Sequence, residues 1–285
     1  MNENKKSLLA PMLAMCLLPA MYLLRAGADN YLYFTLGAVL TLLPEGVLLI
    51  LLGAAFYKKE PMPLPVTLPL LTALGLFFGV MPFITVGGLS RLNSYFSSPY
   101  IGSLLVTMLI LLSGLYIAFL SEGAVRRLCS AVLLIVLALF LAAVLTAIKS
   151  GELTNLHLYS PSPAEDIKRG LLAGALIFEP DLYYLTLCLT RGRQGGWGRF
   201  LAAKAGLILL FTLPVIYVLG EHAKNARLPA YELAAFSKSV LIERFNGLFM
   251  MCMTLAAIIK TALEMHALKL CAMRLSVRRG ANEKA

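Results

Sequence analysis

Long apolar stretches follow one another along this chain, and short segments between them hold most of the charged side chains. Eight stretches are long enough to cross a bilayer at about 1.5 Å of rise per helical residue. They cover approximately residues 7–24, 30–57, 62–90, 99–121, 128–148, 170–190, 200–220 and 245–273. The runs are continuously apolar, without the alternation of barrel strands. The pattern predicts an all-α polytopic membrane protein with about eight transmembrane helices.

The composition leads to the same class. Of the 285 residues, 59% are hydrophobic and 14% are charged, and the mean hydropathy is +0.80. Ordinary soluble domains hold about a quarter charged residues, so a soluble core of this size cannot bury so much apolar surface. We expect a single transmembrane domain over residues 1–285, surrounded by the lipid bilayer.

The distribution of charge predicts the orientation. The net charge is +10, but no segment interleaves basic and aromatic side chains, so nucleic acid is not an expected partner. If the N-terminus is cytoplasmic, the cytoplasmic segments are richer in basic residues and the opposite segments richer in acids, as the positive-inside rule requires. The cytoplasmic set includes Lys5, Lys6, Lys58, Lys59, Arg126, Arg127, Lys204, Arg278 and Arg279. We therefore expect both termini in the cytoplasm.

Motifs for common enzyme chemistry are absent. The five cysteines form no C-x-x-C pair, which argues against a zinc site or a disulfide framework. The sequence has no G-x-x-x-x-G-K-[ST], H-E-x-x-H or G-x-S-x-G. We expect no enzymatic activity, no cofactor and no metal.

Five charged residues lie inside the expected spans. They are Glu45, Glu179, Asp181, Lys260 and Glu264. A charge near the bilayer centre costs several kcal/mol unless it is paired, neutralised or hydrated, so each of these side chains requires a partner or a role.

The stretch LIFEPDLYYL (176–185) places two of these acids on either side of Pro180. On an intact helix Glu179 and Asp181 would point roughly 200° apart. Proline cannot donate to the carbonyl of Leu176, and it restricts the backbone of the residue before it. We expect a break between Ala175 and Asp181, because non-helical backbone at this depth is tolerated where protein or a water-filled cavity surrounds it. Broken helices of this kind form ligand sites in many transporters; the alternative is a structural kink.

The other intramembrane charges allow simpler explanations. Lys260 and Glu264 are four residues apart and share a helix face, so they can pair, although Lys260 could instead extend toward the headgroups. Glu45 follows Pro44, which indicates a second kink with a buried acid. Structural and functional roles are both open for Glu45.

Two of the segments that connect the expected spans are longer than a simple turn. Residues 149–169 are polar and include two prolines. Residues 228–243 have apolar positions spaced for one helix face, which predicts a short helix on the outer surface.

Three segments, in this order and spacing, resemble the spore germination receptor B-subunit family. They are AGADNYLYFTLGAVL (26–40), GELTNLHLYS (151–160) and LPAYELAAFSKSVLIERFNGLF (228–249). The resemblance implies the LeuT-like fold of the amino acid–polyamine–organocation superfamily, with two inverted five-helix repeats. Residues 1–148 would form the first repeat, 149–169 an outer loop, 170–273 a truncated second repeat and 274–285 a cytoplasmic tail.

The resemblance also implies a role and a site. The family senses small germinants, often amino acids, with A- and C-type partner subunits in the spore inner membrane. Its ligand lies between broken helices one and six. The positions expected to bind it here are Leu18, Pro19, Phe78, Ala175, Phe178, Glu179 and Asp181. Pro180, Glu45, Lys260 and Glu264 are expected to have structural or coupling roles.

Two other functions remain open at this stage. The chain could be a proton- or cation-coupled amino acid transporter of a bacterial cell membrane, with Glu179 or Asp181 holding the proton. It could also be an assembly subunit of a receptor complex that binds no ligand. Uptake into proteoliposomes distinguishes the first, and silent cavity substitutions distinguish the second.

Overall fold

The computed structural model describes residues 9–26, 28–55, 64–96, 103–156, 159–191, 197–236 and 246–282, and these residues form helices and connecting turns without a β-strand. The α-helices are α1 (Leu9–Tyr22), α2 (Tyr31–Leu40), α3 (Leu42–Ala55), α4 (Leu64–Phe96), α5 (Ser103–Phe119), α6 (Glu122–Ala147), α7 (Pro163–Ala175), α8 (Glu179–Arg191), α9 (Trp197–Leu219), α10 (Pro229–Phe236) and α11 (Asn246–Asn282). Short 3₁₀ turns cover Leu23–Ala26, Ile148–Ser150, Leu153–Leu156 and Gly220–Lys224.

The helices are those of an integral membrane protein, as the sequence predicts. Among the described residues, six helical segments have the length and apolarity to cross a bilayer. They are Tyr31–Leu51, Thr67–Leu89, Glu122–Ser150, Pro163–Thr190, Trp197–Lys224 and Gly247–Ser276. The first and fourth of the eight expected spans contain the shorter apolar helices Leu9–Tyr22 and Leu104–Phe119. The all-α class is thus confirmed, with six spans of full length.

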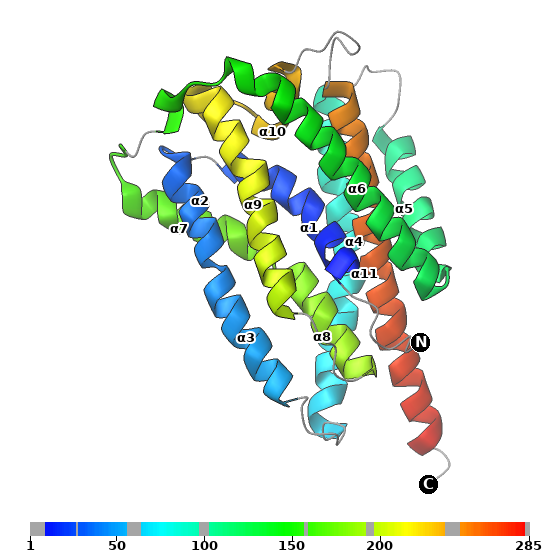
Figure 1. Cartoon of the computed structure of the whole chain (residues 1–285). Coiled ribbons are helices and arrows are strands. Elements are labelled where there is room, and N and C mark those ends of the chain that lie inside the picture. Colours follow the sequence, from blue (N-terminus) through cyan, green and yellow to red (C-terminus); the bar gives the residue numbers. More distant parts are fainter. Residues whose placement is uncertain are drawn as a thin grey trace, which may run out of the picture.

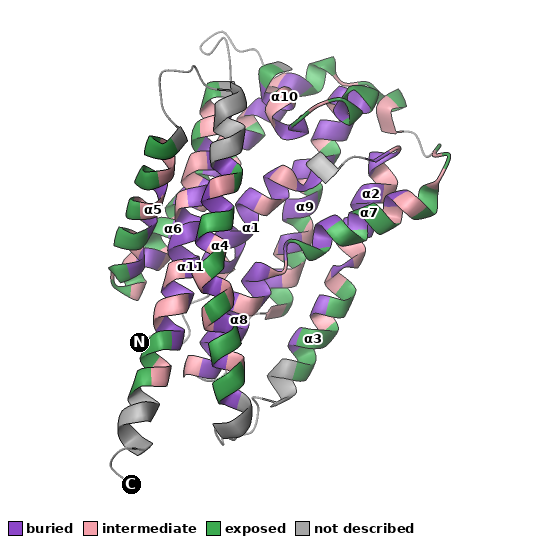
Figure 2. Ribbon diagram, turned by 180° about the vertical axis from the view of Figure 1, so that it is seen from behind, coloured by how far each residue is buried: buried purple, intermediate pink, exposed green. Residues whose placement is uncertain are grey.

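The bundle surrounds α1. This helix packs against α6, α8, α9 and α11, and nearly every side chain from Pro11 to Met21 is buried. A helix that is apolar all round belongs in such a core. Figure 2 shows α1 coloured almost entirely as buried, whereas α3 and α5 have exposed faces. The exposed side chains on α5 are large and apolar, Leu104 and Phe119 among them, as expected for contact with lipid.

Figure 1 shows α10 at one end of the bundle, together with the turns that follow α6 and α9. We call this the α10 end. Helix α10 agrees with the short helix predicted within 228–243, and Leu228, Leu233 and Ala234 are buried against the bundle. Residues 237–245 of that segment lie outside the described residues.

The first span differs from the expectation. Free backbone groups were predicted near Pro19, as in a broken helix, but α1 continues through Pro19 to Tyr22. Pro19 has no amide to donate to the carbonyl of Met15, and this costs one helical bond without ending the helix. Leu18 is buried in the core. The interruption expected in the first span is therefore not present.

The second span has the predicted kink. Helix α2 ends at Leu40 and α3 begins at Leu42, with Pro44 in the first turn of α3. Pro44 cannot donate to the carbonyl of Leu40, which explains why α2 ends at that residue. The amide of Glu45 resumes the helical bonding by donating to the carbonyl of Thr41 at 3.3 Å.

Glycines bring α2 and α7 into backbone contact. A Cβ added to Gly170 would meet the carbonyl of Phe34 and the amide of Ala38, and one added to Gly174 would meet the carbonyl of Ala38. Gly37 on α2 approaches the backbone of Ile167 in the same way. Gly170 and Gly174 are four residues apart, so they form the small-xxx-small face that lets membrane helices approach closely. Gly170 and Gly174 thus set the close packing of α7 on α2 just before the break.

We expect Gly170→Val to lower the free energy of unfolding by about 1–3 kcal/mol or more, because the added side chain has to displace backbone rather than flexible side chains. Thermal unfolding of the purified protein in detergent measures the loss. Gly79→Ala is the control, since nothing lies within 4 Å of its added Cβ. Equal stability of Gly170→Val and the wild type would contradict the close approach of α2 and α7.

Candidate functional site

The sixth expected span is interrupted where the sequence predicts a break. Helix α7 ends at Ala175 and α8 begins at Glu179. The amides of Asp181 and Leu182 donate to the carbonyl of Phe178 at 3.1 and 3.3 Å, which starts the second helix. Pro180 lies in this first turn, where a backbone amide is not needed. Glu179 was expected to be outside the helix and is instead its first residue.

The two acids of this turn point to different neighbours. An oxygen of Glu179 lies 2.6 Å from Nζ of Lys260 on α11, and Oδ2 of Asp181 lies 3.0 Å from Nζ of Lys204 on α9. The two acids therefore contact different helices, and each has a lysine. The start of α8 is bound by ion pairs on both sides, within the protein interior.

We define the Lys260 cluster as Thr85, Glu179, Lys260 and Glu264, from helices α4, α8 and α11. The Lys260 ammonium donates to Oε1 of Glu264 and to Oγ1 of Thr85, both at 2.7 Å. The Thr85 hydroxyl in turn donates to Oε1 of Glu264 at 2.9 Å. The predicted Lys260–Glu264 pair is confirmed, and the alternative in which Lys260 extends toward the headgroups is not observed.

We define the Lys204 cluster as Glu45, Asp181 and Lys204, from helices α3, α8 and α9. The Lys204 ammonium lies 2.6 Å from Oε2 of Glu45 and 3.0 Å from Oδ2 of Asp181. The ring centroid of Phe200 is 5.8 Å from the ammonium. Lys204 is 0% exposed. Glu45 thus has Lys204 as its partner, which the sequence did not predict.

Lys204 is not where the sequence predicts it. It was expected among the cytoplasmic basic residues, but it is one of the most deeply buried side chains of the described structure. Its position within the apolar run 200–220 was one available signal. The other was the imbalance among the intramembrane charges, because four acids with a single lysine leave acids without a partner.

Each cluster holds two carboxylates and one ammonium. Within them, Oε1 of Glu45, Oδ1 of Asp181 and Oε2 of Glu264 are buried and have no hydrogen-bond partner. Helix α1 packs against α8, α9 and α11, which carry Asp181, Lys204 and Lys260. Helix α1 therefore lies beside the start of α8 and close to both clusters.

The remaining predicted ligand positions are dispersed. Phe178 is half-buried at the break, and Phe78 is fully buried on α4 in edge contact with Phe77. Ala175 is exposed, and the next residue, Leu176, is 75% exposed. The side chain of Ala175 is thus on the exposed side of the break, so it does not line a buried site with Glu179.

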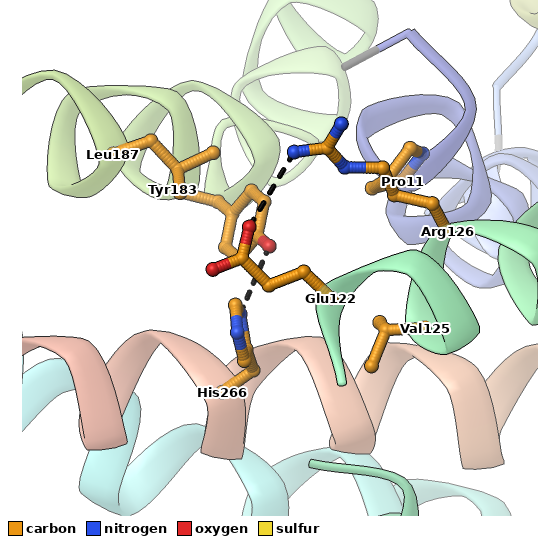
Figure 3. Close-up of a pocket in the computed structure, with 7 residues that line it drawn as sticks. All are labelled: Pro11, Glu122, Val125, Arg126, Tyr183, Leu187 and His266. Atoms are coloured by element: carbon orange, nitrogen blue, oxygen red, sulfur yellow. Dashed lines mark hydrogen bonds and ion pairs between the residues drawn. The ribbon is translucent and has the colours of Figure 1, made fainter. Parts of the chain in front are cut away.

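A small recess lies beside α8, toward the end of the bundle opposite α10. Figure 3 shows its polar lining, with the Tyr183 hydroxyl directed at His266 and Arg126 directed at Glu122. The Tyr183 hydroxyl and Nδ1 of His266 are 3.2 Å apart. Tyr183 is one helical turn after Glu179, so the recess approaches the Lys260 cluster along one face of α8. The sequence analysis did not identify this recess.

Asp166 joins the segments at the α10 end. Its carboxylate is fully buried and accepts from the amides of Asp29 and Asn30, at 2.8 and 2.9 Å, and from the hydroxyl of Ser160 at 2.7 Å. Asn30 also caps α2 and donates to the carbonyl of Tyr159 at 2.9 Å. This carboxylate therefore binds the start of α2 to the start of α7.

We expect Asp166→Asn to lower the free energy of unfolding by about 1–3 kcal/mol, because the amide has one acceptor oxygen and leaves a buried donor unsatisfied. Unfolding in detergent tests this. Glu165→Gln is the control, since Glu165 is exposed and its nearest basic atom is 3.6 Å away. A similar, small effect of both changes would show that the Asp166 bonds contribute little.

Comparison of the chain with protein-family models, with curated proteins and with solved structures finds no match.

Proposed function

We propose that this chain is a permease-like membrane subunit that binds a small zwitterion, foremost an amino acid, at the start of α8. The observation on which this rests is the buried ion pair between Glu179 and Lys260 at the break of a membrane-spanning segment. Secondary transporters place their ligands at discontinuous helices of this kind. The subunit would resemble the B-subunit of spore germination receptors and would act as a sensor.

A zwitterion has both charges needed to replace the pair. Its ammonium can take the place of Lys260 beside Glu179, and its carboxylate can take the place of Glu179 beside Lys260. The N-terminus of α8 adds a favourable potential for the carboxylate. Phe178, half-buried at the break, is placed to cover the ligand, as expected for a gate.

At the α10 end, the first two segments that resemble the receptor family are in contact, and the third is packed at the same end of the bundle. The segment 26–40 is bonded through Asn30 to the outer loop, and Asn155 of that loop donates to the carbonyl of Tyr217 at 2.9 Å. In the third segment, the rings of Tyr231 and Phe249 are 6.4 Å apart. Segments that are distant in sequence thus form one packed region.

The resemblance supplies the remaining parts of the proposal. The α10 end would face outward, both termini would be cytoplasmic, and residues 1–148 and 170–273 would be the complete and truncated repeats. A- and C-type subunits would be the partners in a spore inner membrane.

A stability screen of the purified protein against the common amino acids tests the proposal. A ligand that binds only the native state raises its stability by about 2.7 kcal/mol at a hundred times Kd. We expect one or a few amino acids to stabilise the wild type. If none does, either with the chain alone or with its A- and C-type partners present, the proposed function is wrong. Concentrative uptake into proteoliposomes would indicate a transporter instead of a sensor.

A further inference from the structure

The proposed ligand site uses the Lys260 cluster and leaves the Lys204 cluster without a function. The three side chains of the Lys204 cluster come from three helices that are separated in sequence, and none is more than 5% exposed. The cluster therefore lies in the protein interior, away from the lipid surface. Charges buried at this depth must be paired, neutralised or hydrated.

The charges of the Lys204 cluster do not balance. Lys204 contacts one oxygen of Glu45 and one of Asp181. The other oxygen of each acid, Oε1 of Glu45 and Oδ1 of Asp181, is buried without a hydrogen-bond partner. If both acids were ionised, the cluster would have a net charge of −1 and two unsatisfied anionic oxygens in a medium of low dielectric constant, which is strongly unfavourable.

Among the described residues, no cation other than Lys204 forms an ion pair with Glu45 or Asp181. The ring of Phe200 lies beside the Lys204 ammonium, and the titratable group that α1 contributes in this region is the buried thiol of Cys16. On the other side of α8, Glu179 is a further acid and is held by Lys260. The ammonium of Lys204 already occupies the position between the two carboxylates, so a metal ion there would be repelled.

We propose that the Lys204 cluster is a proton-binding site, in which one exchangeable proton is shared between Glu45 and Asp181. A proton on either of the two unpartnered oxygens makes the cluster neutral and converts that oxygen into a donor. With the proton on Asp181, the start of α8 loses its charged bond to α9, and with the proton on Glu45, α3 loses the corresponding bond. The position of the proton thus determines which helix is held more firmly by Lys204.

Infrared spectroscopy of the ligand-free protein tests this directly. A protonated carboxyl group has a C=O stretching band that an ionised carboxylate lacks, and the band shifts in D₂O when its proton exchanges. We expect the spectrum of Glu45→Gln, and likewise that of Asp181→Asn, to lack the band of one protonated carboxyl group that the wild-type spectrum contains. Either change leaves a neutral lysine–acid pair, so both variants should fold. The side chains of the Lys260 cluster are the same in all three proteins, so their bands cancel in the difference spectra.

Glu165→Gln is the matched control and should retain the wild-type band, because Glu165 is exposed. If neither variant can be purified, Glu264→Gln is measured in their place. It leaves one acid for the lysine of the Lys260 cluster, so an exchangeable carboxyl band that remains belongs to the Lys204 cluster and its absence overturns the proposal. Absence of the band in the wild type, or an unchanged band in both variants, would overturn the proposal. A band that is lost when sodium replaces a bulky organic cation would identify a sodium site instead. None of these results depends on the amino acid ligand, so a failure here leaves the proposed function standing.

Discussion

Replacement of Lys204 by methionine is expected to lower the free energy of unfolding by about 3–5 kcal/mol, the usual loss when one partner of a buried ion pair is removed. The cause is specific to this cluster. Lys204 is the shared cation of Glu45 and Asp181, at 2.6 and 3.0 Å, and both acids remain buried when it is gone. Unfolding in detergent, followed by heat or denaturant, measures the change.

Two controls separate charge from packing. Lys168→Met makes the same substitution at a side chain that is 68% exposed, and it should cost less than about 0.5 kcal/mol. The triple variant Glu45→Gln, Asp181→Asn, Lys204→Met removes all three charges and should recover most of the stability, because a neutral set has no uncompensated ion. Wild-type stability of Lys204→Met would contradict the buried cluster.

The second large effect concerns the ligand. Glu179→Gln is expected to weaken binding of the zwitterion by about 30-fold or more, which corresponds to about 2 kcal/mol at the low end for a buried charge pair. The variant should still fold, since Lys260 keeps its contacts with Glu264 and Thr85. Titration calorimetry with an amino acid found in the stability screen gives both affinities.

Glu165→Gln makes the same chemical change in the first turn of α7, within the polar segment 149–169, and should bind the ligand as the wild type does. Glu264→Gln is more informative, because it leaves the Glu179–Lys260 pair in place and should retain most of the affinity. Binding by Glu179→Gln with undiminished affinity would show that the ligand, if it binds, does so elsewhere.

The sequence predicted the features that depend on neighbouring residues. The break before α8 followed from Pro180, the kink at α3 from Pro44, and the Lys260–Glu264 pair from a spacing of four residues. The all-α membrane class followed from the apolar runs. Each of these is confirmed because backbone bonding and helical periodicity are local properties.

Features that join distant helices were missed. Nothing local links Lys204 to Glu45, which is 159 positions away, and nothing local reveals that Asp166 binds the start of α2. Pro19 misled in the opposite direction, because the loss of one helical bond does not end the helix. The position of Lys204 within the apolar run 200–220 and the charge count of the expected spans were the two available signs that a further lysine had to be buried.

The measurement that tests the central claim most directly is a binding titration of the wild type with the amino acid found in the screen and with its two single-charge analogues. One analogue lacks the carboxylate and the other lacks the amine. If the ligand replaces the Glu179–Lys260 pair, each analogue should bind about 30-fold more weakly or worse, because one buried charge is left without its partner. An analogue that binds as tightly as the zwitterion would contradict the exchange of that ion pair.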